Sequence, residues 1–375
     1  MQAPSSTDVS KEKTMTKKQI LRFVAFLVAA LMTIVLLCDL FECENTKNYD
    51  QNMYTYRNLP EGTADAVFLG TSGVDRFWIA PKAYEEYGIT AYNLCYDAFP
   101  AWLYTNIIDE IEGMQDTKLI LIDIRAFFQS NTRLDSVEVR SRRYLDSLPF
   151  YNINRIKAAF KTMNLLHEAD PENYKKFDAS YLLSFIKFHS KWSDKYSVYE
   201  NLGSKKQPYG SFYMTDARII RAKPHDKVYF DPNAYHSLDK VTEKALYELI
   251  DYIKEKDLNV LFVDTPQFLG KYELRRANTI YDILEENGMD YIHFYKENSA
   301  DFSINLDNTK DFYDESHVNY YGAEKFTAAL AEYIDENYDL PDARENETAK
   351  KFWDGKYDKI KNKIAKFEKE KAAKK

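Results

Sequence analysis

Two short motifs in this chain contain the residue types of a serine nucleophile and its base. Ser72 follows Gly70 and Thr71 directly after an apolar run, and Asp314 precedes His317 by three residues. An aspartate at that spacing can fold back over one turn and accept the imidazole Nδ1–H, which leaves Nε2 to take a proton from a serine. Each motif is weak alone, because Gly-Thr-Ser is ordinary turn material and a loop histidine beside an aspartate is often a surface pair. Together they predict a catalytic serine (Ser72), a base (His317) and a residue that orients the base (Asp314).

Alternating apolar runs and helical patterns predict an α/β fold that would position these motifs. Five short apolar runs predict buried strands of a parallel sheet, at 64–69, 90–94, 118–124, 259–264 and 291–294. Helical periodicity lies between them, at 100–114, 242–256, 272–287 and 321–336. This alternation predicts a three-layer α/β/α doubly wound parallel sheet of the flavodoxin-like kind. Such sheets bind ligands beyond the carboxyl ends of their strands, which is where Ser72 is expected.

An apolar segment near the N-terminus predicts a membrane anchor. Residues 20–37 are apolar apart from Arg22 and Thr33, near the short end of the roughly 17–25 residues that span a bilayer. The run ends without the small-residue cleavage site of a secretory signal, which favours an uncleaved transmembrane anchor over 20–41. Basic residues precede the run and acidic residues follow it. The tail 1–19 is therefore expected in the cytoplasm and the main domain outside the cell membrane, with a single pass.

Composition argues against several classes of protein and site. With 11 glycines and 11 prolines in 375 residues, the chain is neither collagen-like nor of low complexity. Its net charge is −8 and its main body lacks a basic stripe, so no nucleic-acid partner is expected. Cys38, Cys43 and Cys95 form neither a disulfide framework nor a metal-ligand spacing. The histidines lack zinc-site spacing and no phosphate-binding glycine loop is present, so neither a metal nor a cofactor is expected.

Two further segments lie outside the predicted α/β domain, which is expected over 45–126 and 240–340. Residues 127–239 are rich in Tyr, Phe, Lys and Arg and contain helical stretches, so we expect a mostly helical insertion over the sheet edge. Residues 344–375 carry apolar side chains three or four apart among many lysines, which predicts a charged amphipathic helix. That helix either lies on an anionic surface or a partner, or is a solvated tail.

Around its two chemical motifs the chain resembles the SGNH (GDSL-like) hydrolase superfamily, over about residues 60–126 and 240–337. Residues 70–72 are similar to the family's nucleophile block, which follows the first strand. The stretch DESHVNYYGAEKFT, which contains Asp314 and His317, is similar to the ending of many membrane-anchored members. The resemblance implies an SGNH-type fold and the same three catalytic residues.

Two other blocks of the family concern the groups that would hold an oxyanion or the substrate. Asn93 and Cys95 lie in a stretch similar to the second block, where the family prefers glycine in place of Cys95 and uses its backbone N–H. The third block, usually Gly-x-Asn-Asp, has no counterpart here. Gln267 is expected to supply the missing side-chain donor, or Arg125 to hold an anionic or sugar group. Asn93, Cys95, Arg125 and Gln267 are therefore the expected oxyanion or substrate-binding residues.

The resemblance implies an acyl-ester enzyme that works outside the membrane. A single-anchor SGNH domain is similar to proteins associated with O-acetylation of bacterial exopolysaccharides and cell walls, and to the D-alanylation protein of teichoic acid synthesis. That implies hydrolysis or O-acetyl (or other acyl) transfer on a cell-surface polysaccharide, with a polytopic membrane-bound O-acyltransferase as partner. The sequence does not separate transfer from hydrolysis. The alternative is a catalytically inactive SGNH-like scaffold that binds polysaccharide or that partner, which the absent third block favours.

Overall fold

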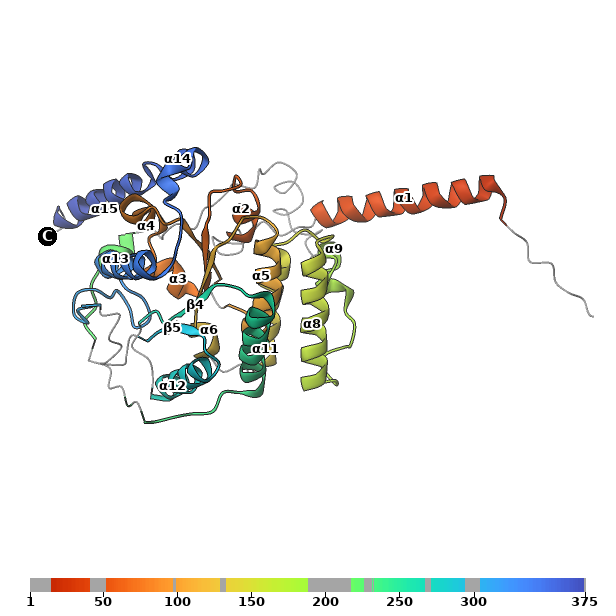
Figure 1. Cartoon of the computed structure of the whole chain (residues 1–375). Helices are drawn as coiled ribbons and strands as arrows, with labels where there is room; N and C mark the ends of the chain where they lie inside the picture. The colour runs from red at the N-terminus through yellow and green to blue at the C-terminus, as the bar shows by residue number, and fades with distance from the viewer. Residues whose placement is uncertain are drawn as a thin grey trace, which may run out of the picture. The chain divides into compact units, whose positions relative to one another are not determined.

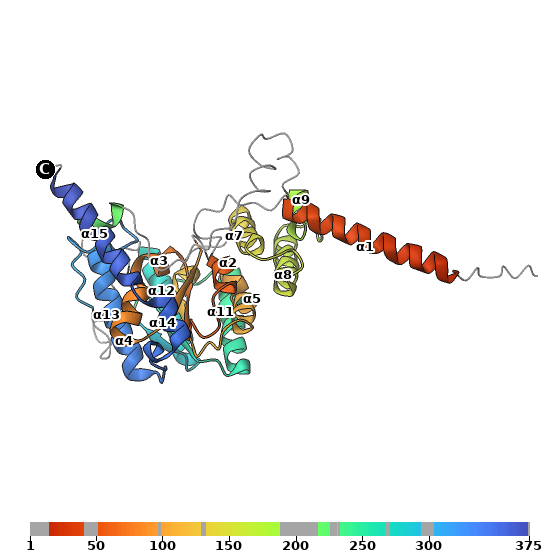
Figure 2. The ribbon, with the colours of Figure 1, turned by 90° about the horizontal axis from the view of Figure 1, so that it is seen from above.

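The computed structural model describes residues 15–40, 52–96, 99–128, 133–187, 217–225, 231, 233–266, 271–293 and 304–373. The chain divides into two compact units, and Figures 1 and 2 show it from two directions. One unit consists of Met1–Cys43 and Leu183–Ser204. The other consists of Glu44–Leu182 and Lys205–Lys375.

The main element of the first unit is the helix α1 (Lys17–Leu40). Its stretch Lys17–Cys38 is 22 residues long and apolar enough to cross a membrane. Large apolar side chains along it are exposed, for example Phe26 at 66%, whereas the core helix of a soluble protein buries one face. Thr33 Oγ1 donates a hydrogen bond to the carbonyl four residues earlier (2.9 Å), so this polar side chain is satisfied within the helix. The short helix α9 (Ser184–Lys187) packs against α1.

The second unit is built on five parallel strands in the order β2-β1-β3-β4-β5. They are β1 (Ala66–Gly70), β2 (Ala91–Cys95), β3 (Leu119–Asp123), β4 (Val260–Val263) and β5 (Asp290–Ile292). The predicted parallel α/β sheet is thus confirmed. The order reverses between β1 and β3, because the chain adds β2 on one side of β1 and all later strands on the other. Open parallel sheets bind ligands at such a reversal, beyond the carboxyl ends of the strands.

Both faces of the sheet are buried, because its strands alternate apolar side chains between two cores. Val67 and Leu69 of β1 lie in the first core, with side chains of α5 (Tyr104–Glu112), α11 (Lys240–Lys256) and α12 (Lys271–Glu286). Ala66 and Phe68 lie in the second core, with side chains of α3 (Ser72–Phe77), α4 (Ala80–Tyr87) and α13 (Tyr320–Asn337). Figure 1 shows α5 and α11 on one side of the strands and α3, α4 and α13 on the other.

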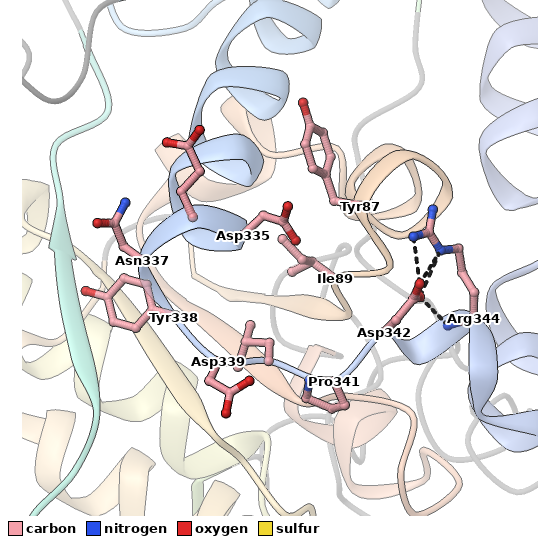
Figure 3. A pocket seen from close by; sticks show the side chains of 11 residues that line it. Tyr87, Ile89, Asp335, Asn337, Tyr338, Asp339, Pro341, Asp342 and Arg344 are labelled. Atoms are coloured by element: carbon pink, nitrogen blue, oxygen red, sulfur yellow. Dashed lines mark hydrogen bonds and ion pairs between the residues drawn. The ribbon is translucent and has the colours of Figure 1, made fainter.

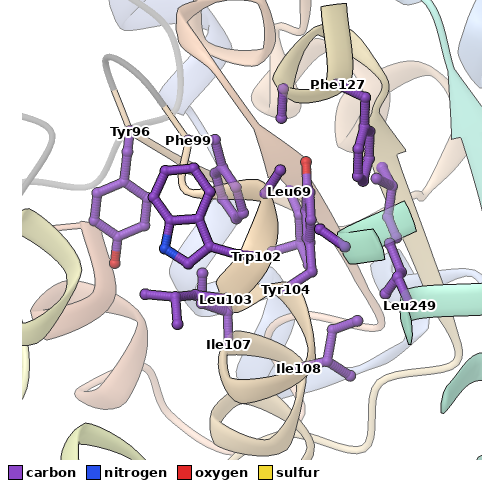
Figure 4. Close-up of a cluster of buried hydrophobic side chains, with 14 of the residues drawn as sticks. Leu69, Tyr96, Phe99, Trp102, Leu103, Tyr104, Ile107, Ile108, Phe127 and Leu249 are labelled. Atoms are coloured by element: carbon purple, nitrogen blue, oxygen red, sulfur yellow. The ribbon is translucent and has the colours of Figure 1, made fainter. Parts of the chain in front are cut away.

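Aromatic rings fill the first core beside the carboxyl ends of β1 and β3 (Figure 4). Tyr104 stacks on Phe99 with ring centroids 4.3 Å apart and on Phe127 at 5.5 Å. Its hydroxyl donates a hydrogen bond to the carbonyl of Asp123 (3.2 Å). This series of rings therefore packs against the end of β3.

Capping residues set the starts of three long helices. The side-chain oxygens of Asn152, Asp239 and Asn319 accept N–H groups from the first turns of α8 (Ile153–Ala169), α11 and α13. Other described helices are α2 (Asn52–Arg57), η1 (Ala101–Leu103), α6 (Arg125–Phe128), α7 (Leu134–Asp146), η2 (Ala179–Tyr181), η4 (Ala217–Ile220) and η5 (Ala343–Glu345).

The insertion expected over 127–239 is described in part. Its helices α7 and α8 pack together, and Val137, Tyr144 and Met163 lie in the first core with the sheet. This part of the insertion therefore shares a core with the sheet. Residues 188–216 lie outside the described residues.

The C-terminal segment is two helices, not the single helix expected over 344–375. The helix α14 (Glu347–Trp353) ends before Gly355, and α15 (Lys356–Ala372) begins after it. Gly355 has φ of 71°, a left-handed conformation that interrupts the helix and favours glycine. The segment is not a solvated tail, because its apolar side chains belong to the second core: Trp353, Tyr357, Ile360 and Ile364.

Candidate active site

Thr71 and Ser72 form the junction between β1 and α3. Thr71 has extended backbone and caps α3, since its side-chain oxygen accepts the N–H of Gly73 (3.2 Å). Its hydroxyl donates to a carboxylate oxygen of Asp123 at 2.7 Å. Ser72 is therefore the first helical residue, directly beyond the carboxyl end of β1, and it is partly exposed.

Asp314 and His317 lie in a loop closed by an isolated antiparallel bridge between Phe312 and Val318. Asp314 Oδ1 accepts the N–H of Ser316 at 2.8 Å, a local turn typical of aspartate. Both oxygens of the same carboxylate also lie close to His317 Nδ1, at 2.9 and 3.0 Å. The Asp-x-x-His spacing thus places the carboxylate against the imidazole within one turn.

The start of α13 sets where this loop ends. Asn319 Oδ1 accepts the N–H groups of Tyr321 (3.0 Å) and Gly322 (3.1 Å) and so caps the helix. A Cβ on Gly322 would lie 2.4 Å from the carbonyl oxygen of Asp311, so only glycine fits there. The His-x-Asn-x-x-Gly spacing therefore follows from a cap and a close backbone approach, which together place His317 three residues before the first residue of α13.

These two regions bring Ser72 and His317 together from 245 residues apart in the sequence. Ser72 Oγ lies 2.8 Å from His317 Nε2. Because an ionised Asp314 carboxylate only accepts hydrogen bonds, the imidazole Nδ1 carries the proton and Nε2 accepts from the serine hydroxyl. The His317 side chain is 19% exposed, so the contact is accessible from solvent. The arrangement has the geometry of a nucleophile, its base and the group that orients the base.

The charges around His317 favour its neutral form. Burial lowers the pKa of His317, and the positive charges of Arg125 and Arg76 lower this pKa further, against the opposing effect of Asp314. Burial acts to raise the pKa of Asp314, but the hydrogen bond and charge of His317 bring that pKa below its usual value. At neutral pH the imidazole is therefore ready to accept a proton, and the carboxylate is ionised.

Asp123, the last residue of β3, connects the strand ends beneath this contact. It is fully buried, and its Oδ2 accepts the N–H (3.3 Å) and the hydroxyl (2.7 Å) of Thr71. Its Oδ1 accepts the hydroxyl of Thr265 (3.1 Å) and the N–H of Arg125 (3.2 Å). Burial raises the pKa of Asp123, while the Arg125 charge and these hydrogen bonds oppose the rise. The sequence held a signal for this role: a carboxylate inside the apolar run 118–124.

Gly70 and Gly73 are required by the close packing of this junction. A Cβ on Gly70 would lie 2.3 Å from the Cβ of Asp123. A Cβ on Gly73 would lie 2.5 Å from Thr265 Oγ1 and 3.1 Å from the Arg125 side chain. The Gly-Thr-Ser-Gly stretch therefore leaves room for the buried groups that support Ser72.

The two residues of the second block, Asn93 and Cys95, both lie in β2. Asn93 is fully buried, and its Nδ2 donates to the carbonyls of Val74 (3.3 Å) and Trp78 (3.0 Å). The Asn93 side chain therefore holds α3 against β2 on the sheet face under α3, and the expected oxyanion or substrate-binding role of Asn93 stays a prediction. Cys95 is the buried last residue of β2, in register with Gly70. The expected use of its backbone N–H stays a prediction.

Of the two residues expected to replace the third block, the structure describes Arg125 but not Gln267. Gln267 lies outside the described residues. Arg125 is 4% exposed, and its guanidinium donates hydrogen bonds to the carbonyls of Thr265 and Ser316. Arg125 thus joins two loops of the site, and its expected contact with substrate stays a prediction.

Two side chains that the sequence analysis did not single out border His317. The Tyr313 ring stacks on the imidazole, with ring centroids 5.7 Å apart and planes at 12°. The guanidinium carbon of Arg76 lies 6.0 Å from the centre of the Tyr313 ring, and Arg76 Nη1 lies 3.9 Å from an Asp75 carboxylate oxygen. Arg76 follows Ser72 by four residues on α3, and this i, i+4 spacing was the signal that could have placed it near the serine.

A cavity of about 400 Å³ lies away from Ser72, at the end of α13 (Figure 3). Ile89, which precedes β2, lines it, and Tyr338 in its wall donates a hydrogen bond to Asp290 at the start of β5. The cavity therefore lies toward the amino ends of the strands, and it shares no residue with the serine site. Its other polar lining residues are Tyr87, Asp335, Glu336, Asn337, Asp339, Asp342 and Arg344.

Comparisons with protein-family models, with curated proteins and with solved structures found no match for this chain. Its function is therefore inferred from the geometry of the serine site and from the motifs that form it.

Proposed function

We propose that this chain is a serine esterase or O-acyltransferase of the SGNH type. The observation that carries the proposal is the continuous chain of contacts from Ser72 Oγ to His317 Nε2 (2.8 Å) and from His317 Nδ1 to Asp314 (2.9 Å). The location of Ser72 beyond β1, where the strand order reverses, supports it. The proposal includes the finer fold, a three-layer α/β/α doubly wound sheet with the helical insertion.

In the proposed first step Ser72 Oγ attacks the carbonyl carbon of an ester while its proton passes to His317 Nε2. The tetrahedral intermediate then expels the alcohol, which takes the proton from His317 and leaves an acyl-serine. In the second step His317 deprotonates a water or a sugar hydroxyl, and that oxygen attacks the acyl carbon. Release of the acid or the new ester returns the proton to Ser72. Asp314 stabilises the imidazolium during both steps and is not consumed.

The developing negative charge on the carbonyl oxygen needs hydrogen-bond donors. Ser72 N–H is a candidate, because the first N–H groups of a helix have no acceptor within the helix. Cys95 N–H is the second candidate, as the motif resemblance implies. One such donor contributes about 2.7–4 kcal/mol of transition-state stabilisation in serine hydrolases, so the activity depends on both.

We also propose that α1 anchors the enzyme in the cell membrane with the main domain outside. The exposed apolar surface of α1 supports its role as an anchor. The basic residues that precede it support the orientation with the main domain outside. A serine enzyme at that location would act on an acylated or acyl-accepting cell-surface polysaccharide. By the same motif resemblance, a polytopic membrane-bound O-acyltransferase would deliver the acyl group.

Burst kinetics of the full chain in detergent with p-nitrophenyl acetate test the catalytic role of Ser72. We expect a burst of p-nitrophenol and an acetylated Ser72 by peptide mass spectrometry, because His317 is neutral and in contact with the hydroxyl. The Ser72→Ala variant should lose both signals. The matched control is Ser237→Ala, which alters an exposed serine and should keep the wild-type burst.

A burst that persists in Ser72→Ala, or acetylation found at another residue, would overturn the assignment of the nucleophile. If the wild type shows no acyl-enzyme, the inactive-scaffold alternative gains support, and polysaccharide binding becomes the property to measure. When an acyl-enzyme forms, adding oligosaccharide acceptors separates the two reactions: transfer yields an acylated sugar, and hydrolysis yields free acetate only.

A further inference from the structure

Arg125, the first residue of α6, is a buried cation at the carboxyl ends of β3 and β4. Its Nε and Nη2 donate to the carbonyl of Thr265, at 3.1 and 2.9 Å. Its Nη2 also donates to the carbonyl of Ser316 at 2.7 Å. Ser316 is the residue immediately before His317, so one planar guanidinium joins the segment after β4 to the loop that carries the histidine.

The same side chain also contacts the helix that carries the nucleophile. A Cβ on Gly73 would lie 3.1 Å from Arg125 Cδ and Cζ, so α3 packs directly on the guanidinium. The guanidinium carbon lies 5.1 Å from the centre of the Phe77 ring, at the other end of α3. Arg125 therefore lies between the element that positions Ser72 and the loop that positions His317.

We propose that Arg125 is a positioning residue that sets the His317 loop at the distance from α3 at which Nε2 meets Ser72 Oγ. The inference rests on the proposed function, because it assigns the contact between Ser72 and His317 a role in acyl transfer. Arginine suits this role better than lysine, since its rigid fork holds two carbonyls at once whereas an ammonium is a single point charge on a flexible stem.

The charge of Arg125 acts on His317 as well. The charged groups that face His317 are Asp314 on its own loop, Arg76 on α3 and Arg125 on α6. The arginines lower the pKa of His317 and Asp314 opposes them, with Arg125 the stronger of the two cations. The buried carboxyl groups that face Arg125 are Asp123 and Asp264. Removing the Arg125 charge should therefore raise the pKa of His317.

Two variants in the full chain separate the position of Arg125 from its charge. Arg125→Met removes both, so kcat for p-nitrophenyl acetate should fall about 100-fold, with KM nearly unchanged. In this variant the acid limb of the pH profile of kcat/KM should move to higher pH, because the pKa of His317 rises. Arg125→Lys keeps the charge but not the fork, so kcat should fall about tenfold while the acid limb stays near the wild-type pH. The control Arg133→Met alters an arginine that is 76% exposed, and neither quantity should change.

Circular dichroism shows whether each variant is folded. The fraction of protein that becomes acylated at Ser72 gives the active fraction, and kcat is corrected by it. The inference is overturned if folded Arg125→Lys keeps wild-type kcat, or if Arg125→Met loses only stability and keeps the wild-type kcat and acid limb.

A readout that needs no activity distinguishes failure of this inference from failure of the proposed function. The ring of His317 can be titrated by NMR in histidine-labelled protein and assigned with His317→Gln. If the wild type proves inert, the proposed function fails, while a higher titration midpoint in Arg125→Met still supports the link between Arg125 and His317. If Arg125→Met leaves both the titration midpoint of His317 and kcat unchanged, the positioning role of Arg125 is rejected.

Discussion

At the residue scale, two buried carboxyl groups at neighbouring strand ends differ in how they are satisfied. Asp123 accepts hydrogen bonds from Thr71, Thr265 and Arg125, which connect β1, β3 and β4. For Asp264, after β4, burial raises the pKa to about 7, against the Arg125 charge and the Tyr281 hydroxyl. The first group is part of the support of Ser72, and the second makes the stability of the fold depend on pH.

The Asp264→Asn variant tests this pH dependence. The folded pKa of Asp264 lies above its unfolded value of 3.8, so its contribution to stability is fully present below about pH 4 and is lost as pH rises toward 7. Between pH 4 and 8 the wild type should lose more unfolding free energy than Asp264→Asn, by up to about 4 kcal/mol. Urea unfolding of both proteins at a series of pH values measures this difference in unfolding free energy.

The matched control for that experiment is Asp116→Asn, which alters an exposed aspartate and should follow the wild-type curve. Parallel curves for the wild type and Asp264→Asn would show that Asp264 does not hold its proton more tightly in the folded state.

At the scale of elements, the C-terminal helices α14 and α15 cover the second core. Trp353 is 1% exposed, stacks on Tyr84 of α4 with centroids 6.0 Å apart, and donates from Nε1 to the carbonyl of Thr63 at 2.7 Å. These contacts join the end of the chain to the segment before β1. Most lysines of α15 are exposed, among them Lys359, Lys363 and Lys366, so the amphipathic pattern reflects a docked helix.

We expect Trp353→Ala to cost about 3–5 kcal/mol of unfolding free energy, because it removes a large buried ring and leaves a cavity. The control is Lys363→Ala on the exposed face of α15, which should change stability by no more than about 0.5 kcal/mol. Equal stability of both variants in urea unfolding would mean that α14 does not contribute to the core in solution.

At the scale of the whole molecule, the order of the strands places the site. The chain crosses from β2 to β3 on the other side of β1, so residues that follow β1 and β3 come together. The loop before α13 then brings His317 to the same place, from 245 residues further along the sequence than Ser72. The helix α1 belongs to a separate unit, and it is long and apolar enough to cross a membrane.

We expect the full chain to remain in the membrane pellet after alkaline carbonate extraction, with its N-terminus intact. Replacing Leu27 and Leu31 by arginine should release it, because an arginine near the centre of a membrane helix costs about 2.5–3.5 kcal/mol. Lys17→Arg, at the first position of α1, is the control and should stay in the pellet. A mature protein that begins after α1 would show that the segment is a cleaved signal.

Much of the fold could be predicted from local pattern. Residues 119–122 are apolar throughout because they belong to a strand buried on both faces, and the helix at 321–336 shows its apolar stripe. The two chemical motifs could also be recognised, because an N-cap, an Asx turn and a close glycine each act over a few residues. The break at Gly355 was missed, since the amphipathic spacing continues across it.

What the sequence by itself determined are the properties set within a few residues: the apolar strands, the helical stripes, the membrane-type segment and the Asp314–His317 turn. Only the tertiary structure decided the strand order, the contact between Ser72 and His317, and the burial of Asn93 under α3. It also decided that Arg125 joins the β4 and His317 loops. These depend on which distant segments pack together, and a side chain's type and spacing do not specify its partner across 245 residues.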